Sequence, residues 1–100
     1  MTSIDSYAFV HCISLTNVTI PNHVTSIGIG AFKNCDSLKS IEIPSSVTSI
    51  GKEAFRDCKS LTRIEYNGTK EQWENIFKDA EWNVGSIATK IICTDGVIEL

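Results

Sequence analysis

A twenty-residue string occurs nearly three times in this chain, and this repetition constrains the fold more than any other feature. The copies span Thr2–Leu15, Val24–Ile43 and Val47–Tyr66. Phe32 follows Phe9 by 23 positions, and Phe55 follows Phe32 by the same interval. A fixed period in the twenties is typical of solenoids, in which a short unit stacks on copies of itself. We therefore predict a mainly β solenoid of about three 23-residue coils.

Each copy contains two strand-like pieces. Residues 38–43 alternate apolar and polar side chains, and Pro44 then ends the strand because it lacks a ladder donor. Residues 47–50 are short and β-branched, and Gly51 follows where the chain must turn. We therefore expect short strands on both faces of every coil. A stacked column of rings is expected between the faces, each burying about 150–200 Å²: Phe9, Phe32 and Phe55.

The repetition stops after Tyr66, where a C-terminal cap is expected to begin. Thr69 and Gln72 have the spacing of a helix capping box, and the apolar residues that follow recur at helical spacing. This pattern predicts a helix over residues 70–80, with an apolar stripe made of Trp73, Ile76, Phe77 and Ala80. An Asp95-Gly96 turn signal predicts a strand and hairpin over 86–100. Repeats (1–66) and cap (67–100) should form one cooperative domain.

Three of the four cysteines occupy the same repeat position: Cys12, Cys35 and Cys58. This equivalence favours buried free thiols, although stacked strands about 4.8 Å apart also fall within the Cα range of a disulfide. The chain has no Cys-x-x-Cys pair, and neither His11 nor His23 lies at zinc-finger spacing from two cysteines. We expect no metal and no cofactor.

Charge and hydropathy exclude two classes of partner. A formal charge of −3 and a pI near 5.2 give no basic patch for nucleic acid or an anionic membrane. No apolar run approaches the roughly 18 residues of a spanning helix, so membrane insertion is not expected. The first residues also lack the pattern of a signal peptide, which predicts a cytoplasmic location if the sequence is complete.

The sequence does not favour an enzyme. Catalysis needs a nucleophile, a base or a metal that converge in a pocket, whereas a short solenoid offers a shallow ribbon. His11 adjoins Cys12, but Cys12 belongs to the buried column and adjacent side chains usually point apart.

The string Leu-x-x-Ile-x-Ile-Pro-x-x-Val-Thr-Ser-Ile-Gly-x-x-Ala-Phe-x-x-Cys-x-Ser resembles the BspA-like leucine-rich repeats, also called the Treponema pallidum type, over residues 2–66. The segments Tyr66–Trp73 and Cys93–Gly96 resemble the closing part of such proteins, so the chain resembles a C-terminal portion. The resemblance implies a cell-surface or secreted bacterial protein that takes part in adhesion and binds a protein ligand. It implies no catalytic residue.

Two surfaces are candidates for recognition. Stacked strands should display their polar positions as a ribbon, and solenoids bind through such ribbons, although the same residues also suit a merely solubilising role. The ribbon comprises Lys39, Ser40, Glu42, Thr62, Arg63 and Glu65. The second surface is an uncapped N-terminal edge, because unpaired strand edges recruit partners. As an alternative function, this edge would make the chain a structural, self-associating fragment, a homo-oligomer joined through Ile4, Tyr7 and Phe9.

Overall fold

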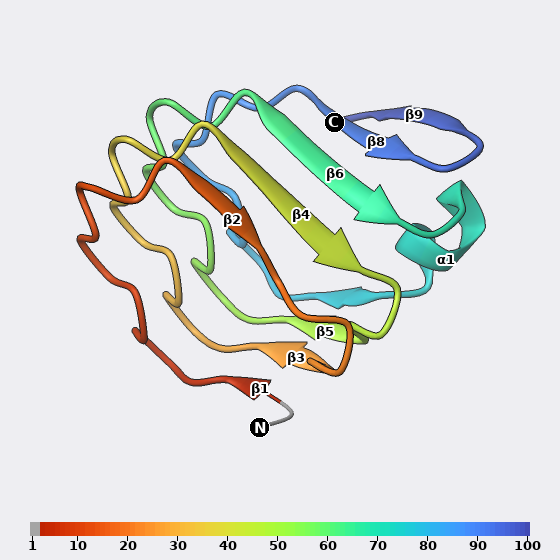
Figure 1. The fold of residues 1–100 in the computed structure, drawn as a ribbon, viewed down its shortest axis with the longest axis horizontal. Helices are drawn as coiled ribbons and strands as arrows, with labels where there is room; N and C mark the ends of the chain where they lie inside the picture. The colour runs from red at the N-terminus through yellow and green to blue at the C-terminus, as the bar shows by residue number, and fades with distance from the viewer. Residues whose placement is uncertain (1–2) are drawn as a thin grey trace.

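Four coils wind around one continuous core in the computed structural model, which describes residues 3–100 (Figure 1). Each coil contributes one strand to each of two sheets, here named sheet A and sheet B. Sheet A has the order β1 (Ser3–Ile4), β3 (Ser26–Ile27), β5 (Ser49–Ile50), β7 (Phe77–Lys78). Sheet B has the order β2 (Asn17–Thr19), β4 (Ser40–Pro44), β6 (Arg63–Asn67), β8 (Lys90–Cys93), β9 (Gly96–Glu99).

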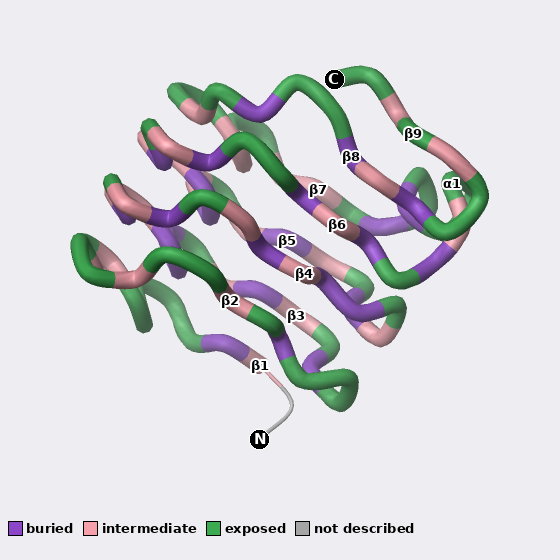
Figure 2. The backbone as a smooth tube through the Cα atoms, turned by 45° about the horizontal axis from the view of Figure 1, so that its top comes forward, coloured by how far each residue is buried: buried purple, intermediate pink, exposed green. Residues whose placement is uncertain are grey.

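The strands of the first three coils pair in parallel with the register that the period predicts. In sheet B, Val18 lies beside Ile41, and Ile41 lies beside Ile64. Ile41 and Ile64 are buried, whereas their neighbours along β4 and β6 are partly exposed, so the strands alternate between core and solvent (Figure 2). The prediction of a β solenoid with strands on both faces is confirmed.

The predicted column of phenylalanine rings runs through the core. Phe9 and Phe32 stack with ring centroids 5.3 Å apart, and Phe32 and Phe55 stack at 5.4 Å. Trp82 continues the column, with its ring edge-on to Phe55 at 6.1 Å. The core therefore extends beyond the three recognised repeats.

Gly51, which the sequence places at a turn, and its repeat equivalent Gly28 are favoured by close packing between coils rather than by an unusual backbone conformation. Neither is among the residues with a left-handed backbone. A Cβ on Gly28 would instead lie 2.7 Å from the Ile4 carbonyl oxygen, and a Cβ on Gly51 would lie 2.7 Å from the Ile29 amide nitrogen. These glycines allow neighbouring coils to approach each other closely.

Two other positions in every coil do adopt the left-handed conformation. One is occupied by Tyr7, Gly30, Glu53 and Glu81, with φ between 58° and 62°. The other is occupied by His11, Asn34, Asp57 and Gly85. Glycine occurs at each position once, which shows that the backbone conformation belongs to the coil rather than to one residue type.

Residues 67–100 form a fourth coil as well as a cap, so the expected number of coils was too low. β7 pairs in parallel with β5, and β8 pairs in parallel with β6. Phe77 lies 28 positions after its partner Ser49, and Ile91 lies 27 positions after its partner Ile64. The longer spacing accommodates the helix α1 (Lys70–Glu74), which masks the repeat in the sequence.

The helix is shorter than predicted, because it ends at Glu74 rather than at residue 80. Its start is as expected: the Gln72 amide donates to the Thr69 hydroxyl at 3.2 Å, and the Thr69 amide donates to the Gln72 side chain at 2.8 Å. At its end, the Lys78 ammonium donates to the Trp73 and Ile76 carbonyls at 2.9 and 3.0 Å. The chain then turns into sheet A.

The apolar stripe of the predicted helix is consequently divided. Trp73 and Ile76 are buried against the third coil, whereas Phe77 lies on β7 with 65% of its surface exposed. Ala80 is exposed beyond the strand. Pairing of β7 with β5 overrides the helical spacing, since it continues the ladder that the first three coils established.

The C-terminal hairpin is present, but its turn lies one residue earlier than predicted. Cys93 pairs with Gly96, so Thr94 and Asp95 form the turn and β8 begins at Lys90. Gly96 has a φ of 143°, and the Asp95 carboxylate accepts a hydrogen bond of 2.9 Å from the Lys70 amide. This bond ties the hairpin to the start of α1.

The cysteines are free thiols, as the repeat favoured. The Cys35 thiol donates to the Phe9 carbonyl, and the Cys58 thiol donates to the Phe32 carbonyl, both at 3.1 Å. Burial raises the pKa of Cys58 to about 12 and also raises the pKa of Cys35. Both side chains therefore act as small buried donors. Cys12, in the first coil, is partly exposed.

Candidate interaction surface

The six residues of the predicted ribbon lie together on the outer face of sheet B. Ser40 lies beside Arg63, and Glu42 lies beside Glu65, on the adjacent strands β4 and β6. Lys39 and Thr62 precede these strands and are joined by a hydrogen bond of 3.0 Å from the Thr62 amide to the Lys39 carbonyl. The inward residues between them anchor the ribbon to the core, so its side chains have fixed spacing.

Hydrogen bonds between strands order the polar side chains of the ribbon. The Ser40 hydroxyl donates to the Asn17 amide oxygen at 2.5 Å. The Glu42 carboxylate accepts from the Asn67 amide at 2.9 Å and from the Thr19 hydroxyl at 3.5 Å. Two neutral donors, Asn67 and Thr19, therefore hold the Glu42 carboxylate in place.

An ion pair between Arg63 and Glu65 reduces the repulsion between the neighbouring carboxylates of Glu42 and Glu65. The Arg63 guanidinium lies 3.2 Å from the Glu65 carboxylate, with 55% and 39% of the two side chains exposed. Solvent screens a pair this exposed, and such pairs contribute about 0–1 kcal/mol to stability. Both groups therefore remain available to a partner at little cost to the fold.

The ribbon continues onto β8 and β9, although the sequence predicts these residues as part of the cap and outside the ribbon. Lys90 pairs with Glu99, and Ile92 pairs with Val97. Glu65 lies beside Ile92 on the other side, so the row of glutamates runs into an apolar pair. Ile92 is half-buried and Val97 is 44% exposed. The alternation over residues 90–93 was visible in the sequence, but its alignment with β6 was hidden by the longer fourth coil.

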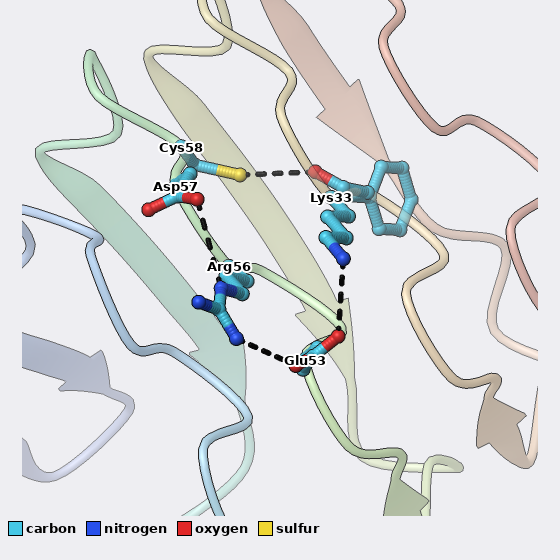
Figure 3. A network of polar contacts seen from close by, with 6 residues as sticks. Lys33, Glu53, Arg56, Asp57 and Cys58 are labelled. Atoms are coloured by element: carbon cyan, nitrogen blue, oxygen red, sulfur yellow. Dashed lines mark hydrogen bonds and ion pairs between the residues drawn. The ribbon is translucent and has the colours of Figure 1, made fainter.

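A charged network lies on the turn side of the second and third coils, away from the ribbon (Figure 3). The Glu53 carboxylate accepts from the Lys33 ammonium at 3.2 Å and from the Arg56 guanidinium at 2.6 Å. These hydrogen bonds, that of Lys33 first, lower the pKa of Glu53. Arg56 also approaches Asp57 at 3.6 Å. The network joins neighbouring coils, which is a structural role.

An apolar pocket of about 320 Å³ opens on the N-terminal face of the first coil. Two of the three residues predicted for self-association, Ile4 and Phe9, line it. Tyr7 does not line it; its ring lies against Gly30, where a Cβ would be 2.5 Å from the Tyr7 ring. The other apolar lining residues are Ala8, Val18, Ile20, Pro21, Val24 and Phe32.

The described residues offer little support for chemistry or for a membrane span. His11 is exposed with a φ of 57°, and the adjacent Cys12 is half-buried. Across residues 3–100, no three potential metal-binding side chains gather at one place. Within the same residues, no helix has both the length and the apolar character needed to cross a bilayer.

The family follows from the repeat itself. A sequence profile described as the BspA type leucine-rich repeat region (6 copies) matches residues 2–93, which includes the fourth coil. The chain belongs to the BspA-type leucine-rich repeat family. The match therefore extends beyond residues 2–66, which contain the repeated string. No curated protein matches this BspA-type chain.

Two solved structures share the BspA-type solenoid. A leucine-rich cell surface protein from Faecalibacterium prausnitzii is 43% identical, with a TM-score of 0.76 over 79% of this chain and 21% of its own. The leucine-rich repeat protein of T. pallidum is 26% identical, with a TM-score of 0.63 over 93% of this chain and 44% of its own. The chain thus spans less than half the length of either protein.

Proposed function

We propose that this BspA-type chain is a non-enzymatic protein-binding module of a bacterial surface protein, and that its partner binds the outer face of sheet B. The observation that carries the proposal is the rigid, five-stranded ribbon, whose exposed side chains have fixed spacing across β2 to β9. The likeness to a protein described as a leucine-rich cell surface protein supports the location. More specifically, we propose that this protein binding serves adhesion.

The charge pattern indicates what kind of protein surface would fit. Lys39, Arg63 and Lys90 lie at or just before the beginnings of successive strands, whereas Glu42 and Glu65 lie further along them. A partner with a row of acidic groups beside a row of basic groups would match both rows, and such complementarity gives specificity and a faster association rate.

The apolar pair Ile92 and Val97 supplies the anchor that the charged rows lack. Buried aromatic and aliphatic anchors usually dominate binding energy, and this pair is smaller than the usual aromatic anchors. We therefore expect the charged rows to select the partner and the apolar pair to add modest affinity. A partner side chain of aliphatic type would suit the pair.

The proposal can be tested by measuring binding to surface-immobilised extracellular-matrix proteins, chosen as probes of the adhesive role. The ribbon variant Glu42→Ser with Arg63→Ser removes one charge of each sign. We expect it to weaken binding about tenfold or more, since two contacts near the centre of the interface are lost. The matched control is Asp36→Ser with Lys59→Ser, which changes the same charges at exposed turn positions outside the ribbon.

Two results would contradict the ribbon as the binding surface. One is an unchanged affinity of the ribbon variant; the other is an equal loss of affinity in the control. Circular dichroism and thermal unfolding of both variants should match the parent chain, because the substituted side chains are at least partly exposed.

A further inference from the structure

A small pocket of about 180 Å³ lies on the side of the solenoid, between the turn that follows β4 and the helix α1. The helix follows β6 directly and lies beside the ends of β4 and β6 (Figure 1). The rim of the pocket consists of exposed residues and its floor of buried ones, which are Ser45, Thr48, Gln72 and Asn75 on the rim and Val47, Tyr66 and Ile76 on the floor. The pocket is therefore built entirely from the interior of the repeat array and its fourth coil.

Tyr66 contributes a hydroxyl that the fold leaves without a hydrogen bond. The residue is only 2% exposed, and no group of residues 3–100 is bonded to its hydroxyl. In the same residues, every side-chain oxygen or nitrogen that is shut off from solvent does have a partner. The hydroxyl therefore faces accessible space, which the pocket provides. A polar group placed so deeply is satisfied only by what enters the pocket.

The residues that line the pocket are all uncharged. Burial raises the pKa of Tyr66, so at neutral pH the phenol keeps its proton and can both donate and accept a hydrogen bond. The Gln72 side-chain oxygen accepts from the Thr69 amide at 2.8 Å, which fixes the orientation of this side chain and leaves its NH₂ group as a donor. An ionised ligand would lose hydration here without gaining an opposite charge. The lining thus favours a neutral ligand that donates and accepts.

The apolar part of the floor favours a ligand with a short aliphatic stem. Val47 and Ile76 are 1% and 6% exposed, so they present apolar surface only at the base of the pocket. The volume corresponds to about six water molecules at about 30 Å³ each, which is the size of one side chain rather than of a large ligand. A glutamine side chain combines a methylene stem with a neutral carboxamide head, and it fits this volume.

We propose that the pocket holds a glutamine side chain of the protein partner, with the carboxamide bonded to the Tyr66 hydroxyl and the Gln72 NH₂ group. The stem packs on Val47 and Ile76. The inference rests on the proposed function, because the glutamine belongs to the protein that binds the ribbon. The rim residue Ser45 directly follows β4, which is one of the ribbon strands, so one partner can reach both places.

Titration of the 100-residue chain with N-acetylglutamine methylamide, followed by nuclear magnetic resonance at pH 7, tests the pocket without any protein partner. We expect saturable shifts of the backbone amides of Val47, Thr48 and Asn75, with a dissociation constant in the millimolar range because one side chain makes few contacts. The matched probe is N-acetylglutamate methylamide, which has the same size but carries a charge. It should bind about tenfold more weakly or worse.

The variant Tyr66→Phe removes only the hydroxyl and should weaken binding of the glutamine probe about two- to tenfold, the contribution of one hydrogen bond. Because this hydroxyl makes no bond within residues 3–100, the urea midpoint of the variant should not fall, which separates a ligand contact from a structural role. Tyr7→Phe removes the other tyrosine hydroxyl of the chain, outside the pocket, and should bind the probe as the parent does. Ser45→Leu, at the exposed rim, should obstruct entry and also weaken binding.

Three results would overturn the inference: shifts that do not saturate, equal binding of the glutamate probe, and an unchanged affinity of Tyr66→Phe. The first would show that the pocket holds water only. None of them bears on the ribbon, since the titration contains no protein partner. Conversely, if the ribbon variant binds matrix proteins like the parent while the titration saturates, the proposed function fails and the glutamine pocket remains.

Discussion

The Cys58 thiol donates a hydrogen bond of 3.1 Å to the Phe32 carbonyl, which fastens the third coil to the backbone of the second. Cys35 makes the same bond to Phe9 one coil earlier. Cysteine at this position therefore contributes both a small apolar group and a donor for a carbonyl beside the ring column. Alternative pairing of these thiols into disulfides would remove both carbonyl bonds.

The buried thiols should react much more slowly than Cys12. Because the thiolate is the reactive form, a pKa of about 12 leaves roughly one Cys58 thiol in ten thousand ionised at pH 8. Iodoacetamide should therefore modify the half-buried Cys12 first, with Cys35 and Cys58 labelled only as the protein unfolds. Mass spectrometry of peptides after timed labelling measures this order. Equal labelling of Cys58 and Cys12 in the folded chain would contradict it.

The repeated part of the fold was predictable because several independent features of the sequence share one period. Strand alternation, the ring column and the cysteine position all recur at 23 residues, so the register of β2, β4 and β6 follows from the period. The role of Gly51 was not predictable, since a close approach between coils depends on atoms that no pattern in one copy specifies.

Substitution of Gly51 by alanine should destabilise the solenoid by about 1–3 kcal/mol, the usual cost of overpacking. Its Cβ would lie 2.7 Å from the Ile29 nitrogen and 2.8 Å from the Gly28 carbonyl carbon, and backbone atoms cannot move aside as a side chain could. Urea unfolding at equilibrium measures the change.

A glycine at a left-handed position should have the opposite effect. His11 is exposed with a φ of 57°, and glycine occupies the equivalent place as Gly85. Glycine removes the strain that a Cβ causes in this conformation, but it also increases the conformational entropy of the unfolded chain. The first effect is the larger, so the free energy of unfolding should rise by about 0.5–1 kcal/mol. If His11→Gly instead destabilised the chain as much as Gly51→Ala does, then backbone strain at position 11 would not limit the stability of the parent chain.

The fourth coil and the extended ribbon were missed for one physical reason. Insertion of α1 lengthens the period to 27 or 28 residues, so Ile91 and Phe77 fall out of the repeat although they remain in its ladders. The spacing of Trp73, Ile76 and Phe77 also fits a longer helix, and pairing of β7 with β5 overrides it. A ribbon predicted only from the copies with a 23-residue period therefore does not include Lys90 and Val97.

The Glu53 network should make the free energy of unfolding depend on pH in the acidic range. Hydrogen bonds from Lys33 and then Arg56 lower the pKa of Glu53 below its ordinary value of 4.5. The unfolded chain therefore binds this proton at a higher pH than the folded chain does. The contribution of Glu53 is complete above pH 4.5 and is lost as the pH falls through the lowered pKa.

Comparison with Glu53→Gln isolates this effect, because glutamine keeps the size of the side chain and the same backbone position. The parent chain should be more stable than the variant at neutral pH, and the difference should shrink as the pH falls below 4.5. Urea midpoints measured across this range provide the test. A difference that does not change with pH would show that the carboxylate charge contributes nothing.

The boundary at residues 66 and 67 should not separate two folding units. Trp82 lies edge-on to Phe55 at 6.1 Å and to Trp73 at 5.7 Å, so the rings of the fourth coil complete the column of the third. Both tryptophans lie in the fourth coil, whereas circular dichroism reports strands throughout the chain. If the chain is one cooperative domain, urea unfolding followed by the two signals should give the same midpoint. Trp82→Ala should lower that shared midpoint, with a loss of about 2–3 kcal/mol for a half-buried ring. Two separate transitions would instead show that residues 67–100 unfold as a detachable cap.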